Sequence, residues 1–149
     1  MEKKDLKPAG VFKYFEEICQ VPRPSKKEEK MIAYLKAFGA KHNLETKVDE
    51  AGNVLIKKPA TPGKENLQTV VLQSHIDMVC EKNNDVQHDF LTDPIETEID
   101  GEWLKAKGTT LGADNGIGVA TELAILADDS IEHGPLECLF TVRRKIGRA

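Results

Sequence analysis

The stretch TVVLQSHIDMVCEKNND, residues 69–85, joins a strand pattern to two side chains that can do chemistry. The run TVVLQ at 69–73 is almost entirely apolar or β-branched, which predicts a strand covered on both faces of an α/β sheet. His75 and Asp77 lie two and four residues after it. Because open α/β sheets bind ligands beyond the carboxyl ends of their strands, we expect these two residues at a ligand site.

His75 and Asp77 allow two interpretations. A neutral imidazole is a common zinc ligand, and its second ring nitrogen is usually held by a carboxylate or a carbonyl. Asp77 is the nearest candidate for that role. A histidine and an aspartate two residues apart also occur by chance, and a hydrogen-bonded structural pair explains them as easily. The residues alone leave both interpretations open.

The sequence before this stretch predicts two helices and two strands. PAGVFKYFEEICQ (8–20) has apolar residues at helical spacing and is stopped by the prolines of VPRP (21–24). SKKEEKMIAYLKAFGAKHN (25–43) opens with Ser25 and Glu28 at the spacing of a capping box, which predicts a helix that starts there. LETKVDEAGNVLIKK (44–58) predicts two strands around a Gly-Asn turn.

The sequence after this stretch completes an α/β pattern. EIDGEWLKA (98–106) carries an Asp-Gly hairpin signal. VATELAILADD (119–129) has helical periodicity, and PLECLFTV (135–142) predicts another buried strand. Strands separated by helices predict a mixed, largely parallel central sheet flanked by helices.

Size and composition exclude several classes of protein. A chain of 149 residues fits one domain. A net charge of -4 gives no basic excess for nucleic acid, and no apolar run approaches the roughly 18 residues of a membrane span. Three widely spaced cysteines indicate neither disulfides nor a cysteine zinc cluster. We therefore expect a cytoplasmic protein with no nucleic-acid or membrane partner.

The glycine-rich stretch KGTTLGADNGIGVA (107–120) is the second candidate functional feature. Its four glycines predict close backbone packing, and Asp114 stands where the next helix begins. Asp114 is either an N-cap or a carboxylate that bridges two metal ions. Gly116 and Gly118 match only part of a nucleotide-binding fingerprint, and no strand with the full spacing precedes them. We expect no phosphate-binding loop.

Several of these motifs together resemble one enzyme family. LQSHIDMVCEKNND, HDFLTDPI, IDGEWLKAKGTTLGADNGIG and HGPLECLFTV, with VPRPSKKEE before them, are similar to the N-terminal part of the bacterial aminoacyl-histidine dipeptidases. These enzymes are also called Xaa-His dipeptidases or cytosolic non-specific dipeptidases, within the dizinc exopeptidase superfamily. The resemblance runs in order from about residue 10 to residue 142. It implies that residues 1–149 are the first part of a peptidase catalytic domain, without its later strands and its lid or dimerisation domain.

The resemblance implies a role for three residues. His75 would bind one zinc ion, Asp77 would orient that histidine and sharpen its basicity, and Asp114 would bridge two zinc ions. Cobalt or manganese could replace zinc. The peptide bond between Asp114 and Asn115 would be cis, as these enzymes tend to have it.

The resemblance also implies a reaction and partners. Metal-bound water, deprotonated by a glutamate, would attack the peptide bond of unblocked dipeptides, including Xaa-His dipeptides. Family members are often homodimers, and the edges of an incomplete sheet would let this chain self-associate.

The last residues depart from the family pattern. Arg144 and Lys145, preceded by Arg143, occupy the positions of two adjacent glutamates, the general base and a zinc ligand. Cationic side chains neither coordinate zinc nor accept a proton from its water. A later carboxylate and a C-terminal histidine are also missing, and a shifted reading frame or a truncated gene would explain both departures.

Two hypotheses follow from this departure. The chain is the N-terminal part of a zinc dipeptidase and is inactive alone, because three or four protein ligands usually hold zinc. Alternatively, it is a non-catalytic remnant that binds metal weakly or interacts with another chain. A plain α/β binding module would leave the glycine-rich stretch unexplained.

Overall fold

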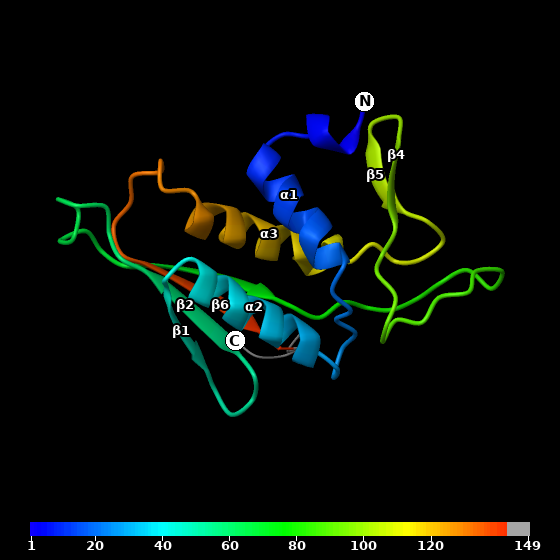
Figure 1. Ribbon diagram of the computed structural model, residues 1–149, viewed down its shortest axis with the longest axis horizontal. Coiled ribbons are helices and arrows are strands. Elements are labelled where there is room, and N and C mark those ends of the chain that lie inside the picture. Colours follow the sequence, from blue (N-terminus) through cyan, green and yellow to red (C-terminus); the bar gives the residue numbers. More distant parts are fainter. Residues whose placement is uncertain (143–149) are drawn as a thin grey trace.

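The computed structural model describes residues 1–142. Three α-helices occur in this range, α1 (Ala9–Cys19), α2 (Glu29–Lys41) and α3 (Ala113–Ala127), after a short 3₁₀ helix at Lys3–Asp5. The described strands are β1 (Glu45–Val48), β2 (Val54–Lys58), β3 (Val70–His75), β4 (Thr97–Asp100), β5 (Trp103–Ala106) and β6 (Leu136–Thr141). Figure 1 shows their arrangement. The predicted α/β fold is confirmed.

The described strands form a mixed sheet and a separate hairpin. The sheet order is β1-β2-β6-β3, and β4 pairs with β5. β3 runs parallel to β6, whereas β1–β2 and β2–β6 are antiparallel, so parallel pairs are the minority among these strands. The β4–β5 turn lies at Gly101 and Glu102, between the paired residues Asp100 and Trp103, so the predicted hairpin is present and its turn starts one residue after Asp100. In the described part of the chain, β3 is one edge of the sheet.

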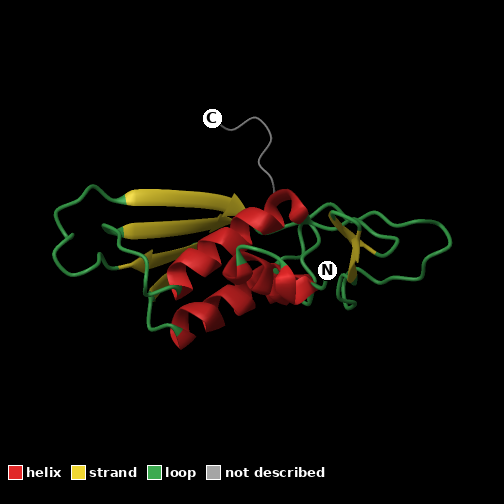
Figure 2. Cartoon of the chain, turned by 90° about the horizontal axis from the view of Figure 1, so that it is seen from above, coloured by secondary structure: helices red, strands yellow, loops and turns green. Residues whose placement is uncertain are grey.

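The helices pack on one face of the sheet (Figure 2). β2 and β6 alternate between buried and half-buried residues, which is the pattern of strands covered on one side. Their buried side chains point into a core shared with the helices, whose fully buried members include Phe15, Leu35, Ile56, Leu123 and Phe140. The core therefore lies between one sheet face and one helical layer.

Two local predictions were wrong. Val70 and Val71 are 50% and 56% exposed, because within residues 1–142 β3 has only β6 beside it and no helix on its second face. α2 begins at Glu29 with Glu28 as its N-cap, and no side-chain capping bond is present. Ser25 lies before the helix and bonds instead to a residue far along the chain.

Candidate functional site

His75 is the last residue of β3 and lies opposite Thr141 of β6. The next residue, Ile76, continues the pairing by donating its backbone N–H to the Thr141 carbonyl at 2.8 Å. These bonds fix the histidine at the carboxyl end of two parallel strands, where the sequence predicted it. Its side chain is 17% exposed, so the ring is largely covered but still reachable.

Asp77 holds one side of the His75 ring. Its Oδ1 lies 3.0 Å from His75 Nδ1, and its carboxylate is only 5% exposed. The second oxygen, Oδ2, accepts a hydrogen bond from the Ser25 hydroxyl. Both carboxylate oxygens of Asp77 therefore have partners, which fixes the plane of the carboxylate and with it the side of the ring that it contacts.

Asp114 lies on the other side of the same ring. Its Oδ1 is 2.9 Å from His75 Nε2, although 39 positions separate the two residues in the sequence. Gly112 turns the chain into α3 with a φ of +79°, which favours glycine. Asp114 and Asn115 keep a non-helical backbone, and the peptide bond between them is cis, as expected.

The three predicted residues thus lie together, with Asp77 and Asp114 on opposite sides of the His75 ring. Each ring nitrogen of His75 faces a carboxylate oxygen. A neutral imidazole carries only one N–H, so it can donate to one of these carboxylates but not to both. A protonated ring, or a cation between Nε2 and Asp114, satisfies both contacts. The arrangement therefore suits a metal ion or a charged hydrogen-bond chain.

The histidine and the two aspartates make up a small ligand set. Among residues 1–142, no group of three or more histidine, cysteine, aspartate or glutamate side chains is placed to hold a metal ion. His75 and Asp114 provide two donors on one side of the ring, with Asp77 behind it. The positions of predicted charge inversion, Arg143, Arg144 and Lys145, lie outside the described residues.

Two further residues around the site were not predicted. Arg23 and Ser25 lie in the segment between α1 and α2. Arg23 donates hydrogen bonds to Ile76 O and Gly112 O, and Ser25 bonds to Asp77. The only signal in the sequence was the VPRPSKKEE motif, which contributed to the family resemblance without indicating a role for either residue.

A buried carboxyl group lies beneath β3. Glu122 of α3 is 4% exposed, and burial raises its pKa to about 7, an effect that the nearby Ser74 hydroxyl opposes. Within the described residues, Glu122 Oε2 and Ser74 Oγ have no hydrogen-bond partner. Ser74 immediately precedes His75, but the side chains of neighbouring strand residues point to opposite faces. Glu122 therefore belongs to the helix-covered side of the sheet.

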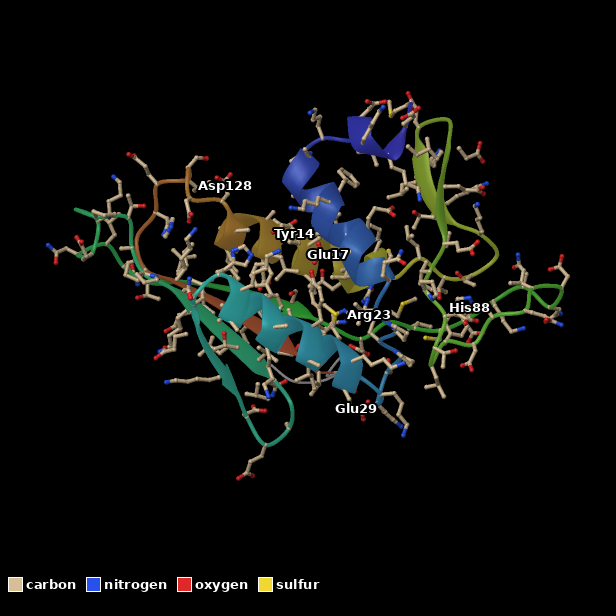
Figure 3. All side chains as sticks on the ribbon, viewed as in Figure 1. Tyr14, Glu17, Arg23, Glu29, His88 and Asp128 are labelled. Atoms are coloured by element: carbon tan, nitrogen blue, oxygen red, sulfur yellow. The ribbon has the colours of Figure 1, made fainter. Side chains whose placement is uncertain are left out.

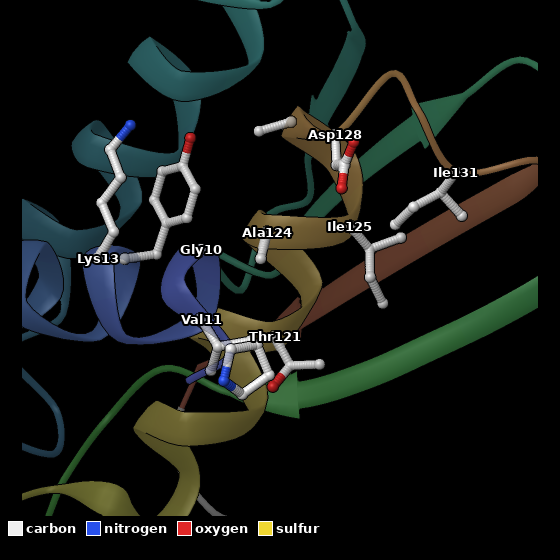
Figure 4. Close-up of a pocket in the computed structure, with 11 residues that line it drawn as sticks. Gly10, Val11, Lys13, Thr121, Ala124, Ile125, Asp128 and Ile131 are labelled. Atoms are coloured by element: carbon white, nitrogen blue, oxygen red, sulfur yellow. The ribbon is translucent and has the colours of Figure 1, made fainter. Parts of the chain in front are cut away.

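A hollow of about 470 Å³ lies elsewhere, between α1 and α3 (Figure 4). Its lining is mainly apolar and includes Val11, Ala124, Ile125 and Ile131. Neither His75 nor the two aspartates line it, so it is separate from the candidate site. In the described part of the chain, no helix has both the length and the apolar character needed to cross a membrane.

Comparisons with known proteins identify what the chain resembles. No family model matches it. It is 51% identical over 146 residues to the cytosol non-specific dipeptidase of Escherichia coli, covering 98% of this chain and 30% of that protein. The crystal structure of aminoacylhistidine dipeptidase from Vibrio alginolyticus matches with a TM-score of 0.94 and 52% identity, over 99% of this chain and 30% of that one.

A more distant match agrees in fold. A tripeptidase from Staphylococcus aureus is 23% identical, with a TM-score of 0.71 over 89% of this chain, which shows the fold alone. The chain spans about 30% of the length of each of the two dipeptidases, as expected for a portion of such an enzyme. The resemblance seen in the motifs is confirmed: the chain is similar in sequence and in fold to part of each of these two dipeptidases.

Proposed function

We propose that this chain is part of a metal-dependent dipeptidase and that it contributes His75, Asp77 and Asp114 to the metal site. The observation that carries the proposal is the position of the His75 ring, with Asp77 3.0 Å from Nδ1 and Asp114 2.9 Å from Nε2. The 51% identity to a cytosol non-specific dipeptidase supports the same conclusion.

Each residue has a distinct role in this proposal. His75 Nε2 and the carboxylate of Asp114 would hold the metal, and Asp114 would be the residue shared by two ions. Asp77 accepts the Nδ1–H of His75, which leaves the lone pair of Nε2 directed at the metal and makes the ring a stronger ligand. Because Ser25 holds the second oxygen of Asp77, the ring keeps this orientation.

Zinc is the proposed metal, with cobalt or manganese as substitutes. When bound, it polarises the peptide carbonyl and lowers the pKa of its water. An imidazole and a carboxylate are ordinary zinc donors, so the two side chains fit the ion. Stable sites take three or four protein ligands, whereas residues 1–142 contribute two. We therefore propose weak binding and no turnover by this chain alone.

The substrate and setting follow from the relatives. The proposed substrates of the complete enzyme are unblocked dipeptides, including Xaa-His dipeptides, and the proposed location is the cytoplasm. Residues 1–149 are the proposed first part of the catalytic domain. The exposed Val70 and Val71 on the edge strand β3 are the proposed route of self-association.

The competing proposal is a non-catalytic remnant that binds metal weakly or serves an interaction. The small ligand set of the described residues and the open edge of β3 favour it. The two proposals share the metal site and differ in whether that site ever serves hydrolysis.

Metal binding and hydrolysis by the purified chain test the metal site that both proposals share and the inactivity that both expect. The purified chain is titrated with zinc by calorimetry and then given an aminoacyl-histidine dipeptide. His75→Ala and Asp114→Ala should abolish the binding, whereas Asp85→Ala, the same change at an exposed aspartate, should leave it unchanged. Equal zinc binding by all three variants would refute the site. Turnover that depends on His75 would refute the proposed inactivity of the chain.

A further inference from the structure

Arg23 is a charged side chain that is almost completely buried. It is 2% exposed and lies where the chain leaves α1 (Figure 3). Its Nη1 donates to Ile76 O at 3.2 Å, and its Nη2 donates to Gly112 O at 2.8 Å. A buried cation normally requires such partners, and here they are two backbone carbonyls from segments far apart in the sequence.

The positions of the two acceptors matter more than their number. Ile76 lies between His75 and Asp77, and Gly112 lies two residues before Asp114. A guanidinium is planar and presents its N–H groups in a fixed fork, so it sets both the distance and the angle between the groups that it joins. Arg23 therefore ties the loop of the histidine to the loop of the second aspartate.

The residues after Arg23 extend the same contact. Met78 donates its backbone N–H to Arg23 O at 3.0 Å, and Pro24 forms a parallel bridge with Met78. Ser25 then bonds to Asp77 Oδ2. Residues 23–25, named here the brace, thus contact residues 76–78 through both main chain and side chain.

Two glycines of the glycine-rich stretch leave room for the guanidinium. A Cβ atom added to Gly112 would lie 2.6 Å from Arg23 Nη2, and one added to Gly116 would lie 2.7 Å from it. Both distances are too short for real contacts. At these two glycines, the predicted close packing is therefore packing against Arg23.

We propose that Arg23 and Ser25 are positioning residues: the brace sets the geometry of His75, Asp77 and Asp114 before any ligand binds. The proposal rests on the metal site proposed above. Burial lowers the pKa of the Arg23 guanidinium, and the charge of Asp77 is among the effects that oppose this. The brace differs from ordinary core packing because its polar atoms contact the segments that carry the site residues.

Ser25 gives the sharper test because its removal leaves the core intact. Ser25→Ala should weaken zinc binding by about 10-fold, the lower end of the effect of losing a partner of a metal ligand, because Ser25 acts through Asp77. Ser25→Thr keeps the hydroxyl and should restore most of the affinity. Ser130→Ala removes an exposed hydroxyl that bonds to Asp128 at 2.6 Å, and it should change nothing. Wild-type zinc affinity in Ser25→Ala would overturn the role of Ser25.

The metal-free chain separates this proposal from the metal site itself. At one fixed pH, the ¹⁵N shifts of the His75 ring should move in Ser25→Ala and stay near wild-type values in Ser25→Thr. Backbone amide shifts at 76–78 and 112–114 should move together in Arg23→Lys. If the wild-type chain binds no zinc, the proposed function fails. The chemical shifts of the metal-free chain still test whether the brace positions the site residues. Unchanged shifts in both loops would overturn it.

Discussion

Two regions next to α3 each bury a charged group, and they differ in what surrounds it. At the carboxyl end of β3, Arg23 is 2% exposed and donates to Ile76 O and Gly112 O. Beneath β3, Glu122 is 4% exposed, and its Oε2 has no hydrogen-bond partner among the described residues. The Arg23 guanidinium bonds to two loops of the candidate site and so joins them. The buried Glu122 carboxylate instead destabilises the interface between α3 and the sheet when it is charged.

This difference shows that burial of a charge does not by itself indicate function. A buried group that bonds to separate segments fixes their relative position, so its loss changes geometry as well as stability. A buried group without such bonds is held by packing, and its environment favours the neutral form. The two regions should therefore respond in opposite directions when their charges are removed.

Removal of the Arg23 charge should have the largest effect. Arg23→Met leaves two buried carbonyls without their donor, and we expect it to lower the free energy of unfolding by about 4 kcal/mol. Urea-induced unfolding measures this loss. Lys36→Met, the same loss of charge at an exposed position of α2, serves as the control and should have little effect. Equal stability of Arg23→Met and Lys36→Met would show that the buried bonds of Arg23 do not stabilise the chain.

Removal of the Glu122 charge should stabilise the chain, but only at high pH. The pKa of Glu122 in the folded chain is about 7, against an ordinary value of 4.5. The folded state therefore binds the extra proton between these pH values, and wild-type stability falls as pH rises through this window. Glu122→Gln should remove this fall, a gain of about 3 kcal/mol at pH 8 and almost none at pH 4.

Unfolding curves across this pH range test the prediction, with Glu122→Gln beside Glu102→Gln. Glu102 is exposed, so its substitution should leave the slope with pH unchanged. A wild-type stability that rises between pH 4.5 and 7, or a Glu122→Gln variant with the wild-type slope, would show that the carboxyl is not penalised by burial.

Two glycine substitutions provide a smaller test of the same comparison. A Cβ at Gly116 would clash with Arg23 Nη2, so Gly116→Ala should destabilise the chain by about 2 kcal/mol. A Cβ at Gly10 meets only Ala124 at 3.5 Å, an ordinary contact, so Gly10→Ala should stabilise α1 by about 0.8 kcal/mol. Thermal unfolding of both variants measures the difference. Stabilisation by Gly116→Ala would show that the Arg23 guanidinium does not require the absence of a side chain at position 116.

Sequence periodicity was enough to predict most elements, and local patterns made His75, Asp77 and Asp114 candidates while leaving their roles open. The apolar run that ends at His75 placed it at the end of a strand, and the glycine-rich stretch placed Asp114 where α3 begins. Both signals are local. The pairing of His75 with Asp114 was expected only from the family resemblance, since no local pattern links residues 39 positions apart.

The brace was missed because its partners are distant in sequence. Arg23 bonds to residues 53 and 89 positions away, and an arginine between two prolines gives no local sign of burial. Ser25 matched the spacing of a capping box, but its hydroxyl bonds to Asp77, 52 positions away. The exposure of Val70 and Val71 was missed for a similar reason, because only the sheet order places β3 at an edge.

The most direct test of the account is the position of zinc in a crystal of this chain grown with the metal. Anomalous diffraction at the zinc edge should place an ion about 2.0–2.2 Å from both His75 Nε2 and an oxygen of Asp114. Asp77 should remain on Nδ1 and Ser25 on Asp77. Zinc bound only at other side chains, with the His75 ring still in direct contact with Asp114, would contradict the proposed metal site.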